Sequence, residues 1–350
     1  MSLTSRSVTA CVIAALLGLL LRTADAQVSP ITADADADWV HAHTGLAVPP
    51  SADGFVRSEI GDLSNDQLNV VVTFQQAETQ TWATVYLFHA GLVDASIWHD
   101  RALAAILAKG ASDAAQAITT KFTPAGHGAD SGLRTTIAVS GGNLTATSVA
   151  LFAHDDWLLK VRMSSSSLSA PALDPVMARF VDALVLPAPS TLAASARPIG
   201  PCADALPASR AKQAKADQTY AILGMAFVQQ AELDRVAERG RDAPETGHGY
   251  CRDRDSPTPH AVYREEGKAA TEGYLMTIGD AGIMVRVQPD AIAGMMDLKG
   301  PHYLVWLWTV DTVVGFSPFK GMPSPAQVAE MLGSKAPVFE AARSVRAARK

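Results

Sequence analysis

A proline-punctuated stretch near the middle of the chain sets the strongest limit on how this chain can fold. Residues 186–201 read LPAPSTLAASARPIGP, a run of small residues and prolines without an apolar period. Proline breaks helices and central strands, and small residues bury little apolar surface. The pattern predicts a linker at 187–201 that separates an N-terminal domain at 38–186 from a C-terminal domain at 202–340.

The first 26 residues have the layout of a secretory signal peptide. MSLTSR carries one positive charge, the apolar run VTACVIAALLGLLL follows, and Ala24-Asp25-Ala26 has the small-x-small form of a cleavage site. We therefore expect a signal peptide at 1–26, cleavage between Ala26 and Gln27, and export to the periplasm or the extracellular space. The apolar run is shorter than the roughly 18 residues of a membrane span, so no transmembrane segment is expected after cleavage. A retained N-terminal anchor is the alternative.

The cysteines outside this segment predict one disulfide bond. Of the three cysteines in the chain, Cys11 lies in the apolar run, which leaves Cys202 and Cys251. An oxidising compartment favours their pairing, which would close a loop of about 50 residues and stabilise the fold by roughly 4 kcal/mol. A catalytic thiol or a pair of zinc ligands is the alternative, although the chain contains no CxxC motif.

The segment 38–186 is predicted to be an α+β domain. Apolar and β-branched runs alternate with turn residues, in the order of two strands, a helix, three strands and a second helix. The predicted strands are 68–74, 81–88, 133–139, 144–153 and 157–164; the predicted helices are 95–109, capped by Asp94, and one that opens at Asp174-Pro175. Because the strands meander and the helices are segregated, we expect an antiparallel sheet covered by helices on one face.

The segment 202–340 is predicted to be a smaller α+β domain, stabilised by the disulfide. A helix is expected at 220–240, with an inward face made of Tyr220, Leu223, Phe227 and Ala231. Antiparallel strands are expected at 274–280, 282–288, 302–308 and 312–316, before a short helix from Pro325. The residues 341–350 are expected to form a basic helical tail, since Arg343, Arg346 and Arg349 recur at every third position.

Composition and motifs exclude several classes of function. Hydrophobic residues make up 48% of the chain and the formal net charge is -6, as in a folded protein rather than a disordered polyanion. The sequence has no clustered Lys and Arg that would neutralise phosphates, so no nucleic-acid partner is expected. G-x-S-x-G, H-E-x-x-H, P-loop and G-x-G-x-x-G motifs are absent from the sequence, so no cofactor is predicted.

The stretch TADADADWVHAH at 32–43 raises the question of a metal site. Its acidic residues and its histidines recur at every second position: Asp34, Asp36, Asp38, His41 and His43. In an extended chain the carboxylates would share one face, and paired imidazoles can bind zinc or copper. Chain ends are commonly loose, however, and alternating Ala and Asp bury nothing. We therefore expect a flexible lead-in at 27–37 and no metal centre, and leave open whether His41 and His43 bind a metal.

Three further histidines form a candidate polar cluster. His89 and His154 end two similar strands, TWATVYLFHA and TATSVALFAH, and His99 lies in the first turn of the helix that follows His89. Three imidazoles at one edge of a sheet would be a candidate site. The alternative is that histidine suits strand ends simply because these positions are half exposed.

The richest polar stretch is HGYCRDRDSPTPHAVYREEGK at 248–268. A nucleophilic Cys251 with a nearby histidine, His248 or His260, would suit a thiol enzyme. The predicted disulfide explains the cysteine with fewer assumptions, and the alternating charges from Arg252 to Asp255 are typical of a solvated loop.

The strand pairs and the phrase DDWLLKVRMS at 155–164 resemble a group of exported bacterial proteins of unknown function. The order of strands and helices in 38–186 is more loosely similar to the Mog1/PsbP-type fold. This resemblance is confined to the N-terminal domain. It is based on the residue types in the strands and includes no diagnostic motif. Members of that fold are mostly non-catalytic binding or assembly factors, which implies such a role here without assigning it to particular residues.

These features predict an exported, two-domain α+β protein that binds or assembles an unidentified protein or envelope partner and has no catalytic centre of its own. The alternative is an extracytoplasmic hydrolase or metal-dependent enzyme whose His and Asp residues converge only in space. A factor retained at the envelope by its N-terminus is a third hypothesis. A deep pocket with converging His and Asp would favour an enzyme, and a shallow sheet face with exposed apolar residues would favour binding.

Overall fold

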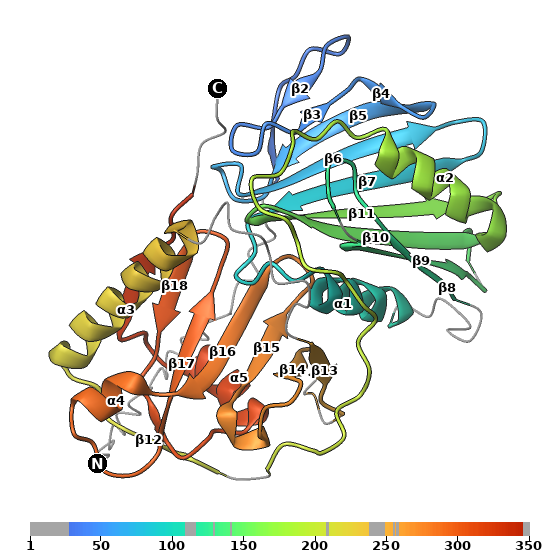
Figure 1. The fold of residues 1–350 in the computed structure, drawn as a ribbon. Helices are drawn as coiled ribbons and strands as arrows, with labels where there is room; N and C mark the ends of the chain where they lie inside the picture. The colour runs from blue at the N-terminus through green and yellow to red at the C-terminus, as the bar shows by residue number, and fades with distance from the viewer. Residues whose placement is uncertain are drawn as a thin grey trace, which may run out of the picture.

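The computed structural model contains two antiparallel sheets that lie next to each other, with helices packed around them (Figure 1). The residues that the structure describes are 28–108, 117–128, 130–140, 142–207, 210–237, 249–254, 256 and 259–345. The expected signal peptide at 1–26, its cleavage site between Ala26 and Gln27, and Arg346 and Arg349 lie outside these residues. The α+β class and the antiparallel sheets are as predicted.

The first sheet is built from strands in the order β1-β5-β6-β7-β11-β10-β9-β8, with β4 paired to β5 outside this order. Its neighbouring strands are all antiparallel. The strands are β1 (Ser29–Pro30), β4 (Ser51–Ala52), β5 (Phe55–Asp62), β6 (Asn69–Gln76), β7 (Thr81–Phe88), β8 (Ile118–Phe122), β9 (Gly132–Ala138), β10 (Ala146–His154) and β11 (Trp157–Ser165). A small ribbon of β2 (Trp39–Val40) and β3 (Ala47–Val48) packs against this sheet.

Helices α1 (Ala95–Leu107) and α2 (Ala170–Asp182) cover opposite faces of the first sheet. Successive residues of a strand point to opposite faces. On β10, Ala150 and Phe152 share a core with α2, whereas Val149 packs with α1. The prediction that helices cover only one face is therefore wrong. The sequence of β10 already reads as a continuous apolar run without alternation, which is typical of a strand buried on both faces.

Helix α1 begins as predicted, and helix α2 begins one turn earlier than predicted. Asp94 caps α1 by accepting a hydrogen bond from the backbone N–H of Ile97. Helix α2 opens after Ser169 with a proline in its first turn, so that Pro175 lies inside the helix. The predicted start at Asp174-Pro175 is wrong because Pro171 provides the same initiating signal earlier in the chain. Asp174 instead accepts a hydrogen bond from Arg134 at 2.9 Å.

The residues expected to form a flexible lead-in at 27–37 are held against the first sheet, as far as the structure describes them. Strand β1 pairs with Asp62 and Gly61 at the end of β5. The guanidinium group of Arg57, also on β5, donates to the carbonyls of Asp34 and Ala37. The expectation failed because β5 itself was missed: its charged residues hide the strand pattern that gives this segment an edge to pair with.

The second sheet has the order β12-β19-β17-β16-β15-β14-β13, with β18 paired to β17 and β20. Its strands are β12 (Lys212–Gln213), β13 (Tyr250–Arg252), β14 (Ala261–Glu265), β15 (Tyr274–Ile278), β16 (Ile283–Pro289), β17 (His302–Trp308), β18 (Thr312–Gly315), β19 (Phe319–Lys320) and β20 (Phe339–Ala342). The helical elements of this half are α3 (Gln218–Ala237), the 3₁₀ helix η2 (Ala270–Glu272), α4 (Ala291–Met295) and α5 (Pro325–Ser334). The predicted strands from residue 274 onward and the helix from Pro325 are confirmed.

Helix α3 packs through a different stripe from the predicted one. Its buried residues recur at every fourth position: Tyr220, Gly224, Val228 and Glu232. Of the predicted inward residues, Tyr220 is buried, Leu223 and Phe227 are half-buried and Ala231 is exposed. The prediction counted only large apolar residues, whereas this stripe uses a glycine for close packing and a glutamate that accepts a hydrogen bond from the backbone N–H of Ser344. The predicted helix end at Gly240 lies outside the described residues.

The described part of the expected basic tail is not helical. Residues 339–342 form strand β20, whose side chains alternate between buried and exposed and which pairs with β18. Arg343 follows this strand and is only 7% exposed. The helical prediction is wrong here because an alternating segment with an open strand to pair with gains more from the sheet than from a helix.

The two halves of the molecule share a hydrophobic core. Phe88, Trp98 and Leu151 of the first half belong to the same cluster as Tyr263 and Met284 of the second half. Figure 1 shows α1 between the first sheet and the strands β13 to β16. The two halves are therefore packed together through apolar side chains as well as joined by the chain.

The tight turn between β15 and β16 brings the second half against the end of β7. Gly282 in this turn has a φ of +87°, and a Cβ atom there would lie 2.9 Å from the Cα atom of Ala90. The Gly282 carbonyl accepts a hydrogen bond from the N–H of Gly91 at 2.8 Å. In the same turn, Asp280 forms an ion pair with the buried Lys160 of β11 at 2.8 Å. Glycine is thus required at 282 for both conformation and close approach.

The connecting segment, residues 187–201, runs past α1 as an extended chain (Figure 1, the yellow-green trace). Its Ser190 and Thr191 backbone N–H groups both donate to the Asp155 carboxylate, and Ala196 N donates to the Asp130 carbonyl. Arg197 forms an ion pair with Glu266 of the second half at 2.6 Å. The segment lacks helix and strand as expected, but it is anchored along its length. No helix among the described residues is long and apolar enough to cross a membrane.

Candidate functional site

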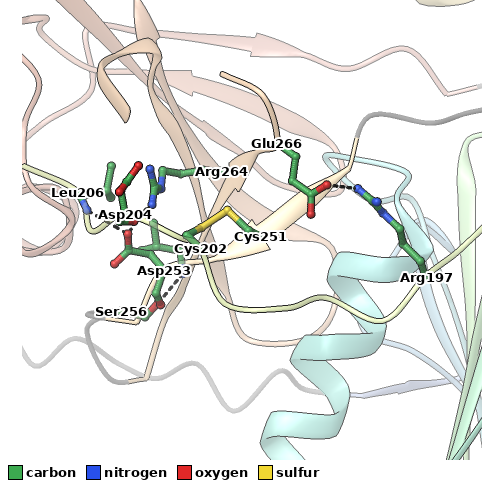
Figure 2. The surroundings of a disulfide bond; sticks show 10 residues. Arg197, Cys202, Asp204, Leu206, Cys251, Asp253, Ser256, Arg264 and Glu266 are labelled. Atoms are coloured by element: carbon green, nitrogen blue, oxygen red, sulfur yellow. Dashed lines mark hydrogen bonds and ion pairs between the residues drawn. A yellow bond between two sulfur atoms is a disulfide. The ribbon is translucent and has the colours of Figure 1, made fainter. Parts of the chain in front are cut away.

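The disulfide anchors one wall of the candidate site. Cys202 and Cys251 are bonded, with their Cα atoms 4.8 Å apart (Figure 2). This confirms the predicted pair and leaves neither sulfur as a thiol nucleophile or zinc ligand. The bond ties the end of the connecting segment to strand β13.

Asp253, next to the disulfide, organises the loop that follows β13. Its carboxylate accepts a hydrogen bond from Leu206 N at 3.1 Å and lies 3.6 Å from the guanidinium Nε of Arg264 (Figure 2). Its carbonyl accepts a hydrogen bond from the Ser256 hydroxyl at 2.8 Å. Because the Asp253 carboxylate is buried and paired, Asp253 itself is held in place beside the disulfide.

A cleft of about 630 Å³ lies between this loop and helix α1. We refer to it as the junction cleft. Its walls are Asp100, Arg101, Ala104, Ala105 and Ala108 of α1, Ile199, Gly200 and Pro201 of the connecting segment, and Arg252, Asp253, Arg254, Ser256, Pro259 and His260 after β13. Clefts that bind small molecules have volumes of roughly 300–1,000 Å³ and occur preferentially where two domains meet.

The guanidinium groups of the junction cleft outnumber its unpaired carboxylates. Arg101 is 8% exposed and donates to the carbonyls of Gly279 and Pro259. Arg254 is exposed and makes no ion pair or hydrogen bond with any residue that the structure describes. Two positive charges in the cleft are therefore left without a directly bonded carboxylate among the described residues.

The acidic residue on the α1 side of the cleft is already neutralised. The Asp100 carboxylate lies 3.3 Å from Arg252 and accepts a hydrogen bond from the Tyr263 hydroxyl at 2.6 Å. Burial raises the pKa of Tyr263 and the negative charge of Asp100 raises it further, so Tyr263 remains a neutral donor. Among the described residues of the cleft, the charges without a bonded partner of opposite sign are those of Arg101 and Arg254, and both are positive.

His260 contributes an unpaired acceptor. Its Nδ1 atom is buried and has no hydrogen-bond partner among the described residues. Burial lowers the pKa of His260; a hydrogen bond to the Thr277 backbone opposes this, and the charge of Arg101 reinforces it. The imidazole is therefore neutral near pH 7 and adds no charge to the cleft.

The cleft lacks an activated nucleophile among its described residues. The Ser256 hydroxyl donates to the Asp253 carbonyl and accepts from Val262 N, so its proton is not directed at a base. Within the described part of the chain, no group of three or more His, Cys, Asp or Glu side chains is placed to hold a metal. The arrangement offers charged and hydrogen-bonding groups for binding.

The structure gives the predicted cluster of His89, His99 and His154 three different environments. His89 donates from Nδ1 to the Val310 carbonyl at 2.7 Å. His99 lies between α1 and β9, with its Nε2 atom 3.1 Å from the Thr135 hydroxyl oxygen. Burial lowers the pKa of His99 to about 4.

His154 packs against a histidine that the sequence did not single out. The ring centroids of His127 and His154 are 5.7 Å apart. No ring contact joins any two of His89, His99 and His154 among the contacts of the described residues.

His41 and His43 gather instead with His89 around Trp157. The ring centroids of these histidines lie 4.9, 5.8 and 5.3 Å from that of Trp157, in this order. This cluster joins the β2–β3 ribbon, the end of β7 and the start of β11, which sequence spacing alone does not bring together.

His41 is held as a hydrogen-bonding group. Its Nε2–H donates to the Gln67 carbonyl at 2.8 Å, and its Nδ1 accepts from Thr44 N at 3.2 Å. A metal could bind His41 only after one of these bonds had broken. The carboxylates of Asp34, Asp36 and Asp38 are exposed.

The junction cleft was only partly visible in the sequence. Its disulfide-linked loop was recognised as the richest polar stretch, but the walls from α1 and the connecting segment were not. A usable signal was the Asp100-Arg101 pair inside an otherwise apolar helix, since charges on such a helix are expected to face solvent or a cleft.

Comparison with known proteins did not identify a relative. No family model matches the chain, and neither curated proteins nor solved structures gave a match. The resemblance to exported bacterial proteins and to the Mog1/PsbP-type fold therefore stays a prediction.

Proposed function

We propose that this protein is an exported, non-catalytic binding protein that holds a small anionic ligand in the junction cleft. The observation that carries the proposal is the cleft of about 630 Å³ between α1 and the disulfide-anchored loop, with Arg101, Arg252 and Arg254 in its walls. Export is supported by the signal-type N-terminal sequence and by the Cys202–Cys251 bond, which is typical of oxidising compartments.

The charge balance of the cleft favours an anion. The carboxylates of Asp100 and Asp253 are paired with Arg252 and Arg264, which leaves Arg101 and Arg254 without a bonded carboxylate among the residues that the structure describes. The planar guanidinium group suits carboxylates and phosphates, which can accept two hydrogen bonds from it.

The remaining walls of the cleft are apolar and small. Ala104, Ala105 and Ala108 of α1 face Ile199 and Pro201 across the cleft. Such walls suit the hydrocarbon part of a ligand because they bury apolar surface without leaving polar groups unpaired. The ligand class is therefore an amphipathic carboxylate or phosphate ester.

Binding of octanoate and octyl phosphate to the full mature chain tests this proposal. Isothermal titration should detect binding of at least one of these anions, and octanol, which lacks the charge, should bind far more weakly. R254A should weaken anion binding by about tenfold or more, because a charge-assisted hydrogen bond contributes about 1.5–3 kcal/mol. R179A, whose arginine pairs with Asp53 at 3.2 Å on α2, is the matched control and should bind normally. Equal affinity for octanol, or no effect of R254A, would contradict the proposal.

One observation favours an enzyme as the second candidate. His260 lines the cleft as a neutral imidazole, and a rotation that exposes its buried Nδ1 would let it act as a general base toward a bound water. A hydrolase of this kind would convert octyl octanoate and water to octanoate and octanol, and H260A would abolish the conversion without removing anion binding. Recovery of the intact ester after long incubation would leave the binding protein as the better description.

A further inference from the structure

A second pair of histidines lies under the connecting segment, away from the junction cleft. His154 ends β10 and is 2% exposed, and His127, in the loop between β8 and β9, is 9% exposed. Their ring centroids are 5.7 Å apart. The two imidazoles thus lie next to each other in the interior, although the chain between them contains an entire strand.

Most of the nitrogen atoms in this pair lack a hydrogen-bond partner. Nδ1 and Nε2 of His127 and Nδ1 of His154 are buried without a partner in the described part of the chain. Leaving one buried polar group unsatisfied costs about 1–3 kcal/mol, so such groups are normally satisfied by a bound water or ion. Three such atoms on two adjacent rings make this pair a candidate site for a ligand that would satisfy them.

The surroundings of the pair favour a cation. Asp155 follows His154 directly, and its negative charge acts on both imidazoles. The Asp155 carboxylate also fixes Thr191 by accepting its backbone N–H at 2.9 Å, and the buried Thr191 hydroxyl oxygen has no partner among the described residues. Each neutral imidazole has one N–H group and one acceptor nitrogen, so the pair offers two lone pairs, and the nearby negative charge of Asp155 favours a positively charged ligand for them.

The spacing of the rings fits a shared metal ion. A metal–nitrogen bond of about 2 Å to each imidazole places two ring centroids roughly 5 to 6 Å apart. Burial lowers the pKa of both histidines, which keeps the imidazoles neutral and able to donate lone pairs at pH 7.

We propose that His127 and His154 bind one transition-metal ion beneath the connecting segment, and that copper is the preferred metal. Imidazole nitrogens suit copper and zinc, and a site with only two of them favours copper, which binds most tightly of the divalent first-row metals. The ion would link the β8–β9 loop to the end of β10, next to the point where Asp155 holds the connecting segment. This site is independent of the proposed anion binding in the junction cleft.

Copper titration of the metal-free, full mature chain tests the proposal. Cu²⁺ should bind at about one ion per chain, since the described chain offers one such pair of unpartnered imidazoles. The electron paramagnetic resonance spectrum of the complex should show hyperfine splitting from two nitrogen nuclei. H127F and H154F, which keep a ring in each place, should each weaken binding by about tenfold or more.

The matched control is H43A, which removes one imidazole of the His41-x-His43 sequence. This variant should retain copper binding, and zinc should bind the wild-type protein more weakly than copper. Loss of binding in H43A would place the metal at the lead-in sequence and overturn the proposal. Undiminished binding in H127F and H154F would overturn it equally.

The wild-type protein alone also decides the matter if the phenylalanine variants do not fold. A natively folded wild-type chain, judged by circular dichroism, that takes up no copper would show that the pair holds a buried water only. A copper complex whose spectrum lacks coupling to two nitrogens would likewise refute a two-histidine site.

Discussion

His41 illustrates how burial at a single residue changes what a histidine can do. Its side chain is fully buried, and both ring nitrogens have hydrogen-bond partners in the first half of the molecule. Burial lowers its pKa to about 4; the charge of His43 acts in the same direction, and the Gln67 hydrogen bond and the charge of Asp62 oppose it. A residue that sequence spacing suggested as a metal ligand therefore acts as a neutral structural group.

We expect this histidine to make the protein less stable as pH falls from about 6.5 toward 4. The pKa of His41 is lowered from 6.5 to about 4 by folding, so the unfolded chain binds more protons across this window. The free energy of unfolding should be unaffected above pH 6.5 and should lose up to about 3 kcal/mol by pH 4. Urea unfolding at a series of pH values measures this loss, and H41Q should reduce it.

His99, a second buried histidine, allows an independent test of this pH dependence of stability. Burial also lowers the pKa of His99 to about 4, so H99Q should remove a separate part of the same pH dependence. The two effects should add in the double variant, because the two side chains share no hydrogen-bond partner. An unchanged pH profile in both single variants would show that other groups cause the acid sensitivity.

At the scale of elements, packing decides what a glycine contributes to a helix. Gly224 of α3 faces β20, and a Cβ atom there would lie 2.2 Å from the Phe339 ring. Gly333 of α5 has open space around it, with nothing within 4 Å of an added Cβ. The same residue type is therefore a packing requirement in one helix and a conformational cost in the other.

These two glycines give a matched pair of substitutions. G224A should destabilise the protein by about 1–3 kcal/mol, because the methyl group forces Phe339 or the helix to shift. G333A should stabilise it by up to about 0.8 kcal/mol, since alanine favours the helical backbone and meets no neighbour. Chemical denaturation of both variants measures the difference. A stabilising G224A would show that α3 does not pack on β20 in this register.

The existence of most elements followed from the sequence, whereas the inward face of α3 did not. β-branched runs marked β6, β7 and β10 because the residue type reports the local backbone preference directly. Strand β5 was missed because its FVRSEIGD sequence carries charges on a half-exposed strand. The face used by α3 depends on what lies opposite, namely Phe339 against Gly224, and a single sequence does not contain that information.

At the scale of the whole molecule, both halves contribute side chains to one shared hydrophobic core. Arg343 from the C-terminal half donates to the carbonyls of His89 and Ala90 at the end of β7. The buried Lys160 pairs with Asp280 across the same junction at 2.8 Å. The division into a linker and two domains stays a prediction, and a single sequence does not reveal polar contacts between residues more than 100 positions apart.

The junction ion pair should tie the unfolding of the two halves together. Replacing Asp280 by Asn leaves the ammonium group of Lys160 buried without its carboxylate, which should cost about 3–5 kcal/mol. K160M should cost less, because a methionine fills the same space without a charge. Differential scanning calorimetry compares the two variants, and D280N should be the less stable one. The reverse order would mean that the pair is solvated in solution.

Removal of the disulfide bond tests whether the two halves of the molecule unfold together. A bond that closes a loop between residues 49 positions apart should stabilise the fold by roughly 4 kcal/mol, mainly by restricting the unfolded chain. If the linker isolated two independent domains, C202S/C251S would lower the melting temperature of the second half alone. Because Phe88 and Trp98 share a core with Tyr263 and Met284, we expect one calorimetric transition that shifts as a whole to lower temperature. Two separated transitions in the variant would show that the shared core is too weak to couple the halves.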